Sequence, residues 1–262
     1  MTISHTTFGA LPAVRICAAN GAEAIVTLYG AHLISWKTGD GRQRLFCSAK
    51  SALDGSRAIR GGVPVIFPQF AERGTGMRHG FARVSTWRLA ASGDASDSTT
   101  ATFELANADL AQGWPHGFTL ALTVSLEGDA LSLSLDVTNT GSDAFAFSGA
   151  LHTYFLVDDL KDARIAGVQH GDLQIEDKLD QIYRAIGGAM ALKQPSGVLA
   201  LTQAGFRDAV VWNPGALDTA ALADMEDDDY LRFVCIEPAL IEPATLAPGA
   251  AWHGTHRISA GV

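Results

Sequence analysis

The chain has 262 residues, of which 47% are hydrophobic and 18% are charged, and its formal net charge is −9. This composition is that of a globular protein, and the negative charge argues against binding nucleic acid or acidic lipid through the protein's general field. No run approaches the ~20 apolar residues that cross a bilayer, and residues 1–20 lack the pattern of a signal peptide. We therefore expect a soluble protein that contacts neither nucleic acid nor membrane.

The chain contains three cysteines, Cys17, Cys47 and Cys235. No two of them form a CxxC pair, and their number is odd. This spacing argues against a disulfide framework and against a zinc site. Together with the missing signal peptide, it predicts a cytoplasmic protein.

Alternation of apolar and polar residues is the dominant pattern along the chain and predicts β-strands. The clearest case is the pair 118–126 and 131–137, which residues 127–129 join as a turn, so an antiparallel hairpin is predicted. The other predicted strands are 13–19, 22–28, 31–36, 86–91, 99–105, 144–155, 207–212, 230–236 and 251–258. A short helix is predicted over 218–225.

Turn-forming residues separate these short strands, and neither a repeat nor a linker divides the chain. Many short strands of this kind are typical of an antiparallel sandwich or barrel. We predict an all-β fold with few short helices, and one domain over residues 1–262.

Residues 57–88 interrupt the strand pattern with glycines, prolines and six arginines, against which Glu72 is the one acid, a local charge of +5. Clustered arginines bind phosphate, and glycines let backbone N–H groups approach it. We expect two or three of these arginines to bind an anion and Arg57, Arg73 and Arg88 to lie at the surface. A structured surface loop with a solvated cationic face is the alternative.

Two ionisable residues stand in apolar strands. His152 shares one face of its predicted strand with Ser148, Ala150 and Tyr154, whose small or polar side chains leave room for a ligand. Glu237 ends the predicted strand 230–236. An imidazole and a carboxylate in such places can act as acid and base. Taken singly, His152 is explained better as a hydrogen-bonded core histidine. Glu237 is explained equally well as an exposed glutamate at the end of a strand.

Several short motifs occur in a fixed order. Residues 59–70 read IRGGVPVIFPQF, residues 79–83 read HGFAR, and Trp87 follows. LHTYF at 151–155, DKL at 177–179, VVWNP at 210–214, CIEP at 235–238 and LAPG at 246–249 come next. Together, over most of the chain, they resemble the D-hexose-6-phosphate mutarotase family, the glucose-6-phosphate 1-epimerases.

The resemblance implies a galactose-mutarotase-like supersandwich, a large antiparallel β-sandwich that binds sugar on its concave face. It implies that His152 and Glu237 are catalytic. It also implies substrate contacts from Arg60, His79, Arg83 and Asp177. The expected partner is a sugar phosphate. We expect a monomer that needs no metal and no organic cofactor.

Three positions depart from the family pattern. Arg78 stands where glutamine is common, Ala71 where glycine is usual, and Gly215 where a large residue often follows Trp-Asn-Pro. We count Arg78 among the expected substrate-binding residues because an additional cation suits a phosphate. The preferred sugar can therefore differ from that of other members.

These features predict an enzyme that interconverts the α and β anomers of a hexose 6-phosphate by opening and closing the ring. Glu237 is expected to take the proton of the C1 hydroxyl and protonated His152 to give one to the ring oxygen, from opposite sides of the C1–O5 unit. An aldose 1-epimerase for unphosphorylated sugars such as galactose is one alternative. A non-catalytic carbohydrate-binding sandwich is another, although the five tryptophans are expected mainly in the core.

Overall fold

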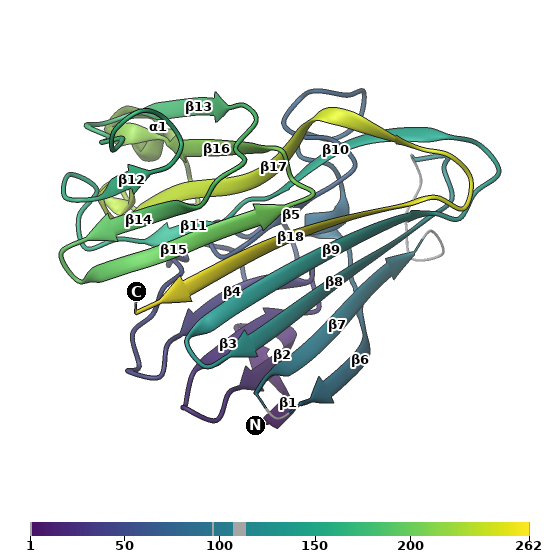
Figure 1. Ribbon diagram of the computed structural model, residues 1–262, viewed down its shortest axis with the longest axis horizontal. Coiled ribbons are helices and arrows are strands. Elements are labelled where there is room, and N and C mark those ends of the chain that lie inside the picture. The colour runs from purple at the N-terminus through teal and green to yellow at the C-terminus, as the bar shows by residue number, and fades with distance from the viewer. Residues whose placement is uncertain (1, 96, 107–113, 262) are drawn as a thin grey trace.

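The protein is described from a computed structural model, which covers residues 2–95, 97–106 and 114–261. Its strands form three antiparallel sheets of eight, six and four strands (Figure 1). Strand accounts for 52% of the structure and helix for 6%, which confirms the predicted all-β class.

The eight-stranded sheet contains the predicted hairpin. Its strands, in spatial order, are β12 (Arg164–Ala166), β14 (Met190–Gln194), β15 (Gly197–Ala204), β18 (Ala251–Ala260), β9 (Ala130–Asn139), β8 (Phe118–Glu127), β7 (Thr99–Ala106) and β6 (Arg88–Asp94). In β8 and β9, Leu126 pairs with Leu131 and Glu127 with Ala130, which confirms the turn predicted between them.

The other two sheets complete the fold. The four-stranded sheet has the order β1 (Thr2–Phe8), β2 (Leu11–Cys17), β3 (Glu23–Thr27) and β4 (His32–Lys37). The six-stranded sheet has the order β13 (Leu179–Tyr183), β16 (Asp208–Asn213), β17 (Phe233–Leu246), β10 (Phe145–Leu151) and β5 (Val65–Ile66), and β11 (Tyr154–Leu156) also pairs with β17.

Helical segments are short. The structure contains one α-helix among its described residues, α1 (Gly215–Ala221), and two 3₁₀ helices, η1 (Ala82–Val84) and η3 (Asp229–Arg232). The helix predicted over 218–225 therefore begins three residues earlier and ends at Ala221. Its first turn follows Pro214, and the Asn213 side chain accepts the Gly215 N–H at 2.9 Å. None of the described helices is long and apolar enough to span a membrane.

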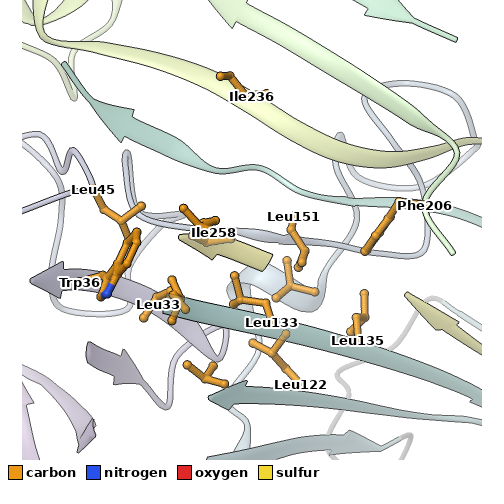
Figure 2. Close-up of a cluster of buried hydrophobic side chains, with 14 of the residues drawn as sticks. Leu33, Trp36, Leu45, Leu122, Leu133, Leu135, Leu151, Phe206, Ile236 and Ile258 are labelled. Carbon is orange, nitrogen blue, oxygen red and sulfur yellow. The ribbon is translucent and has the colours of Figure 1, made fainter. Parts of the chain in front are cut away.

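One continuous hydrophobic core takes side chains from all three sheets. Figure 2 shows part of it, where Leu33 of β4 and Leu122 and Leu133 of the large sheet lie near Leu151 of the six-stranded sheet, and Ile236 of that sheet belongs to the same core. Each is buried. Burial of an aliphatic side chain of this size stabilises the fold by about 1.5–3 kcal/mol, which makes this core the main source of stability.

Two predicted strands differ from the structure at the places where the candidate catalytic residues stand. The predicted strand 144–155 is divided into β10 and β11, and His152 and Thr153 lie in the break between them. The strand predicted to end at Ile236 instead continues through Glu237 to Leu246 as β17. Pro238 lies within the β17–β16 pairing, opposite Ala209.

Candidate active site

One cleft of about 690 Å³ lies on the face of the six-stranded sheet that is turned away from the shared core. Its floor includes a row of side chains across three neighbouring strands, because Ile182 of β13 pairs with Val210 of β16 and Val210 pairs with Glu237 of β17. Residues of the arginine-rich stretch form part of the wall, together with His152 and residues around α1.

The structure brings His152 and Glu237 together in this cleft. His152 Nδ1 lies 3.3 Å from Glu237 Oε1, and the two residues are 9% and 1% exposed. Within the described residues, neither His152 Nδ1 nor Glu237 Oε2 has an aligned hydrogen-bond partner. Unpaired buried polar atoms are uncommon in folded proteins, and here they border a cleft that a polar ligand can enter.

Burial favours the neutral form of both groups. It lowers the pKa of His152 well below its usual value, and nearby His79, Arg60 and Arg83 lower it further. Burial also raises the pKa of Glu237 well above its usual value, with a smaller contribution from the charge of Asp180. Burial therefore opposes the charged form of each group.

His79 lies beside this pair, and its ring centroid is 5.6 Å from that of His152. Its backbone has a φ of 63°, a left-handed conformation that histidine adopts more readily than most residues. His79 Nδ1 accepts the Ala71 N–H at 3.2 Å, so Nε2 carries the hydrogen of the neutral ring. Burial, with Arg83 and Arg78 as further causes, lowers the pKa of His79 to about 3, and the ring is therefore a neutral donor.

Arg60 is held in a fixed position in the wall of the cleft. Its Nε lies 3.2 Å from Asp224 Oδ2, and its Nη1 donates to the Tyr154 hydroxyl at 3.3 Å. Tyr154 in turn stacks on the His152 ring, with a centroid distance of 4.9 Å and an interplanar angle of 10°. The expected substrate residue Arg60 is thus connected to the candidate catalytic histidine through one aromatic ring.

Arg83 has unused binding capacity. Its Nη2 donates to the Arg78 backbone oxygen at 2.9 Å, but its buried Nε has no hydrogen-bond partner within the described residues. Arg83 also forms no ion pair with any described residue. The exposed Arg78, in contrast, lies with its Nη1 3.6 Å from Glu72 Oε1. An incoming anion can therefore bind Arg83 without displacing an acidic side chain.

The surface positions predicted for three arginines are confirmed, since Arg57, Arg73 and Arg88 are exposed. Arg57 and Arg88 do not line the cleft, and Arg88 forms an ion pair with Glu104 instead. Arg73, although exposed, does line the cleft, so its guanidinium belongs to the rim.

Asp177 does not reach the cleft. Its Oδ1 accepts the Ala216 N–H at 2.8 Å, at the start of α1. Gly215 permits this contact, because a Cβ at its position would lie 2.5 Å from Asp177 Oδ1 and its φ is +68°. The cleft is lined instead by Lys178 and Asp180, the residues that follow.

Three residues of the site were not expected from the sequence: Tyr154 and Trp212, which line the cleft, and Asp224, which holds Arg60. Trp212 was expected in the core, yet it lines the cleft and meets His152 edge to face at 5.8 Å. The expectation holds for Trp36 and Trp87, which are fully buried. The VVWNP and LHTYF motifs contained the signal for Trp212 and Tyr154, whereas Asp224 had none beyond its charge.

The aldose 1-epimerase family matches residues 12–182 of the chain. A protein of Cenchrus ciliaris, provisionally named glucose-6-phosphate 1-epimerase, is 34% identical over 95% of this chain and 85% of its own length. A crystal structure of a provisionally named mutarotase from Salmonella typhimurium covers 99% of this chain and 93% of its own, with 26% identity and a TM-score of 0.88.

The galactose mutarotase-like protein of Clostridium acetobutylicum has the same fold, with a TM-score of 0.77 over 100% of this chain and 98% of its own, at 15% identity. This similarity confirms the predicted galactose-mutarotase-like sandwich. The chain is therefore an isomerase of the aldose 1-epimerase family.

Proposed function

We propose that this enzyme interconverts the α and β anomers of a hexose 6-phosphate. The observation that carries the proposal is the position of one buried acid–base pair, His152 and Glu237, in a cleft whose wall also holds Arg83 without an ion-pair partner among the described residues. The pair suits the chemistry at C1, and the arginine suits a phosphate. The Cenchrus ciliaris relative carries the name of such an enzyme.

A phosphate monoester is largely dianionic at pH 7, because its second pKa is about 6. Arg83, which lines the cleft, binds it through its guanidinium, and the more exposed Arg78 contributes at the rim. Arg60, held by Asp224 and Tyr154, completes a cationic wall whose shape is set before the substrate arrives. Preformed charge of this kind lowers the cost of binding.

Ring opening requires one proton removed from the C1 hydroxyl and one delivered to the ring oxygen. Both oxygens are bonded to C1, so two groups that are themselves neighbours can reach them. The separation of 3.3 Å between His152 and Glu237 fits this requirement. It differs from the arrangement on opposite sides of the C1–O5 unit that we expected from the sequence.

The reaction needs a carboxylate as base and an imidazolium as acid. Transfer of a proton from the Glu237 carboxyl to His152, across the 3.3 Å between them, supplies both. Glu237 then accepts the proton of the C1 hydroxyl while His152 protonates the ring oxygen. Closure on the other face of the aldehyde reverses both steps and restores the pair.

The open-chain aldehyde must rotate about its C1–C2 bond without leaving the cleft. The phosphate on the wall arginines anchors the far end of the chain during this step. His79 donates its Nε2–H to an oxygen near C1, because its Nδ1 is already occupied by the Ala71 N–H. His79 therefore orients the sugar rather than exchanging protons with it.

Exchange spectroscopy on the anomers of glucose, galactose and mannose 6-phosphate, beside the three free sugars, tests this proposal. Arg83→Ala should raise KM for hexose 6-phosphates roughly tenfold or more, the value of one charge-assisted hydrogen bond. It should leave exchange of free sugars unchanged. Arg88→Ala, which removes an exposed arginine outside the cleft, is the matched control.

Equal effects of Arg83→Ala on phosphorylated and free sugars would instead identify an epimerase for unphosphorylated aldoses. The same conclusion would follow if the wild-type enzyme accelerated exchange of free galactose more than that of any hexose 6-phosphate. Either outcome would leave the acid–base pair in place and remove the phosphate from the proposal.

A further inference from the structure

Cys235 lies beside the acid–base pair, and the proposed reaction does not use it. Cys235 and Glu237 are two residues apart on β17, so their side chains lie on the same face of the strand. Tyr154 of β11 pairs with Cys235, which brings the break containing His152 next to both. Ligand atoms of His152, Cys235 and Glu237 all lie within 4.8 Å of one another, and all three residues are buried.

The spacing of these atoms suits a tetrahedral metal ion. With Zn–N and Zn–O distances of about 2.0–2.2 Å, two ligands on one tetrahedral ion are roughly 3.3–3.6 Å apart. His152 Nδ1 and Glu237 Oε1 are already 3.3 Å apart. His152 Nδ1 and Glu237 Oε2 also have no hydrogen-bond partner among the described residues, so an ion displaces no existing aligned bond.

Charge and ligand type restrict which ion can bind. A thiolate and a carboxylate together balance one divalent cation, although Arg60 and Arg83 on the same wall repel it. A bond to sulfur must therefore supply much of the binding energy. Thiolate and imidazole ligands select zinc-like ions, whereas Mg²⁺ and Ca²⁺ prefer sites built from oxygen atoms.

We propose that His152, Cys235 and Glu237 form an inhibitory site for a thiophilic divalent cation such as Zn²⁺ or Cd²⁺. The ion enters from the cleft, binds His152 Nδ1, Cys235 Sγ and one Glu237 oxygen, and displaces the thiol proton and the proton of the Glu237 carboxyl to solvent. Its fourth position faces the cleft, from which His152 and Glu237 are accessible. Binding needs only the three side chains, whereas inhibition rests on the proposed function because the ion occupies both acid–base groups.

Titration of the metal-free enzyme with Cd²⁺ tests the site, because a cadmium–thiolate bond absorbs in the near ultraviolet. Wild-type protein should gain this absorption at one equivalent, and Cys235→Ser should not. Calorimetry with Zn²⁺ should show affinity reduced by roughly tenfold or more in Cys235→Ser. Cys47→Ser, which changes a thiol remote from the pair in the sequence, is the control. Mg²⁺ should bind neither to wild-type protein nor to Cys235→Ser.

Anomer exchange of glucose 6-phosphate gives a second readout. Cys235→Ser should keep wild-type exchange in metal-free buffer and should lose its inhibition by Zn²⁺. Cys235→Ala provides a second variant if the serine variant unfolds, which thermal melting would show. The cadmium absorption tests the metal site even if no sugar phosphate is a substrate.

The site is refuted if Cys235→Ser or Cys235→Ala retains the cadmium absorption, or if Cys47→Ser removes it. It is also refuted if Zn²⁺ binds wild-type protein and Cys235→Ser equally well. If metal-free wild-type enzyme did not accelerate anomer exchange, the proposed function would be contradicted. The cadmium absorption would still report on the metal site.

Discussion

The eight-stranded and six-stranded sheets use burial in different ways. In β8 and β9 of the large sheet, buried apolar residues alternate with half-exposed threonine, serine or alanine along most of each strand. In β17 of the six-stranded sheet, the first nine residues are all buried, because one face meets the core and the other packs in two smaller apolar clusters, with Glu237 between them in the cleft. Strands β8 and β9 therefore have one buried apolar face and one half-exposed face, whereas the first part of β17 is covered on both faces.

The difference shows where the molecule gains stability and where it gives some up. Leu122 and Leu133 of the large sheet are fully buried among other apolar side chains. In the six-stranded sheet and the break beside β10, Glu237 and His152 are buried with polar atoms left unpaired. An unpaired buried polar group costs free energy. The large sheet stabilises a fold in which the smaller one can hold reactive groups.

The largest expected effect is the loss of activity in Glu237→Gln. Removing one general acid–base group should slow anomer exchange by roughly 10²–10⁴-fold. The free energy of unfolding should stay equal or rise, because an amide replaces a buried carboxyl without changing its shape. Exchange spectroscopy and urea unfolding measure the two quantities. Exchange near the wild-type rate would show that Glu237 is not catalytic.

The reverse pattern is expected in the large sheet. Leu133→Ala should reduce the free energy of unfolding by about 2–5 kcal/mol, because it leaves a cavity in the core. The rate per folded molecule should not change, since Leu133 lies outside the cleft. Ser134→Ala, at the half-exposed neighbouring position, should change stability by no more than about 0.5 kcal/mol. Equal destabilisation by both variants would contradict the one-sided burial of β9.

The large sheet also contains one buried titratable group, His256 of β18, which is 0% exposed. Burial lowers its pKa from 6.5 to about 4. Between these values the unfolded chain binds more protons than the folded chain, so stability falls as the pH decreases from 6.5 to 4. The loss should approach about 3 kcal/mol for this one group.

His256→Gln removes this titration. Its free energy of unfolding, measured in urea at pH 7 and pH 4.5, should therefore change less between the two conditions than that of wild-type protein. His32, also fully buried with a pKa lowered to about 4, keeps part of the acid sensitivity in the variant. An unchanged pH dependence in His256→Gln would show that this histidine does not contribute.

The smallest effect is expected at the rim of the cleft. Arg78 is exposed and already lies near Glu72, and a solvent-exposed charge contributes at most about 1 kcal/mol. Arg78→Ala should therefore raise KM for a hexose 6-phosphate by no more than roughly fivefold. Arg57→Ala, outside the cleft, should not change it. A larger effect of Arg78→Ala than of Arg83→Ala would make the rim arginine the main phosphate ligand.

The sequence alone determined the β class, the hairpin of β8 and β9 and the presence of an arginine-rich stretch. It did so because alternation records one-sided burial locally, and residues 118–137 are buried on one side only. The ordered motifs placed the chain in its family, which the comparisons confirm. Alternation did not predict β14 and β15. Their short runs contain several alanines and glutamines, and apolar and polar residues therefore alternate only weakly in them.

Only the tertiary structure decided what surrounds the reactive groups. The contact between His152 and Glu237 depends on the pairing of β11 and β10 with β17, which joins segments some 80 residues apart in the sequence. The same pairing places Cys235 beside them, and the contact with Ala216 keeps Asp177 out of the cleft. Local pattern cannot encode such neighbours, because they are set by long-range strand register and by burial on both faces of a sheet.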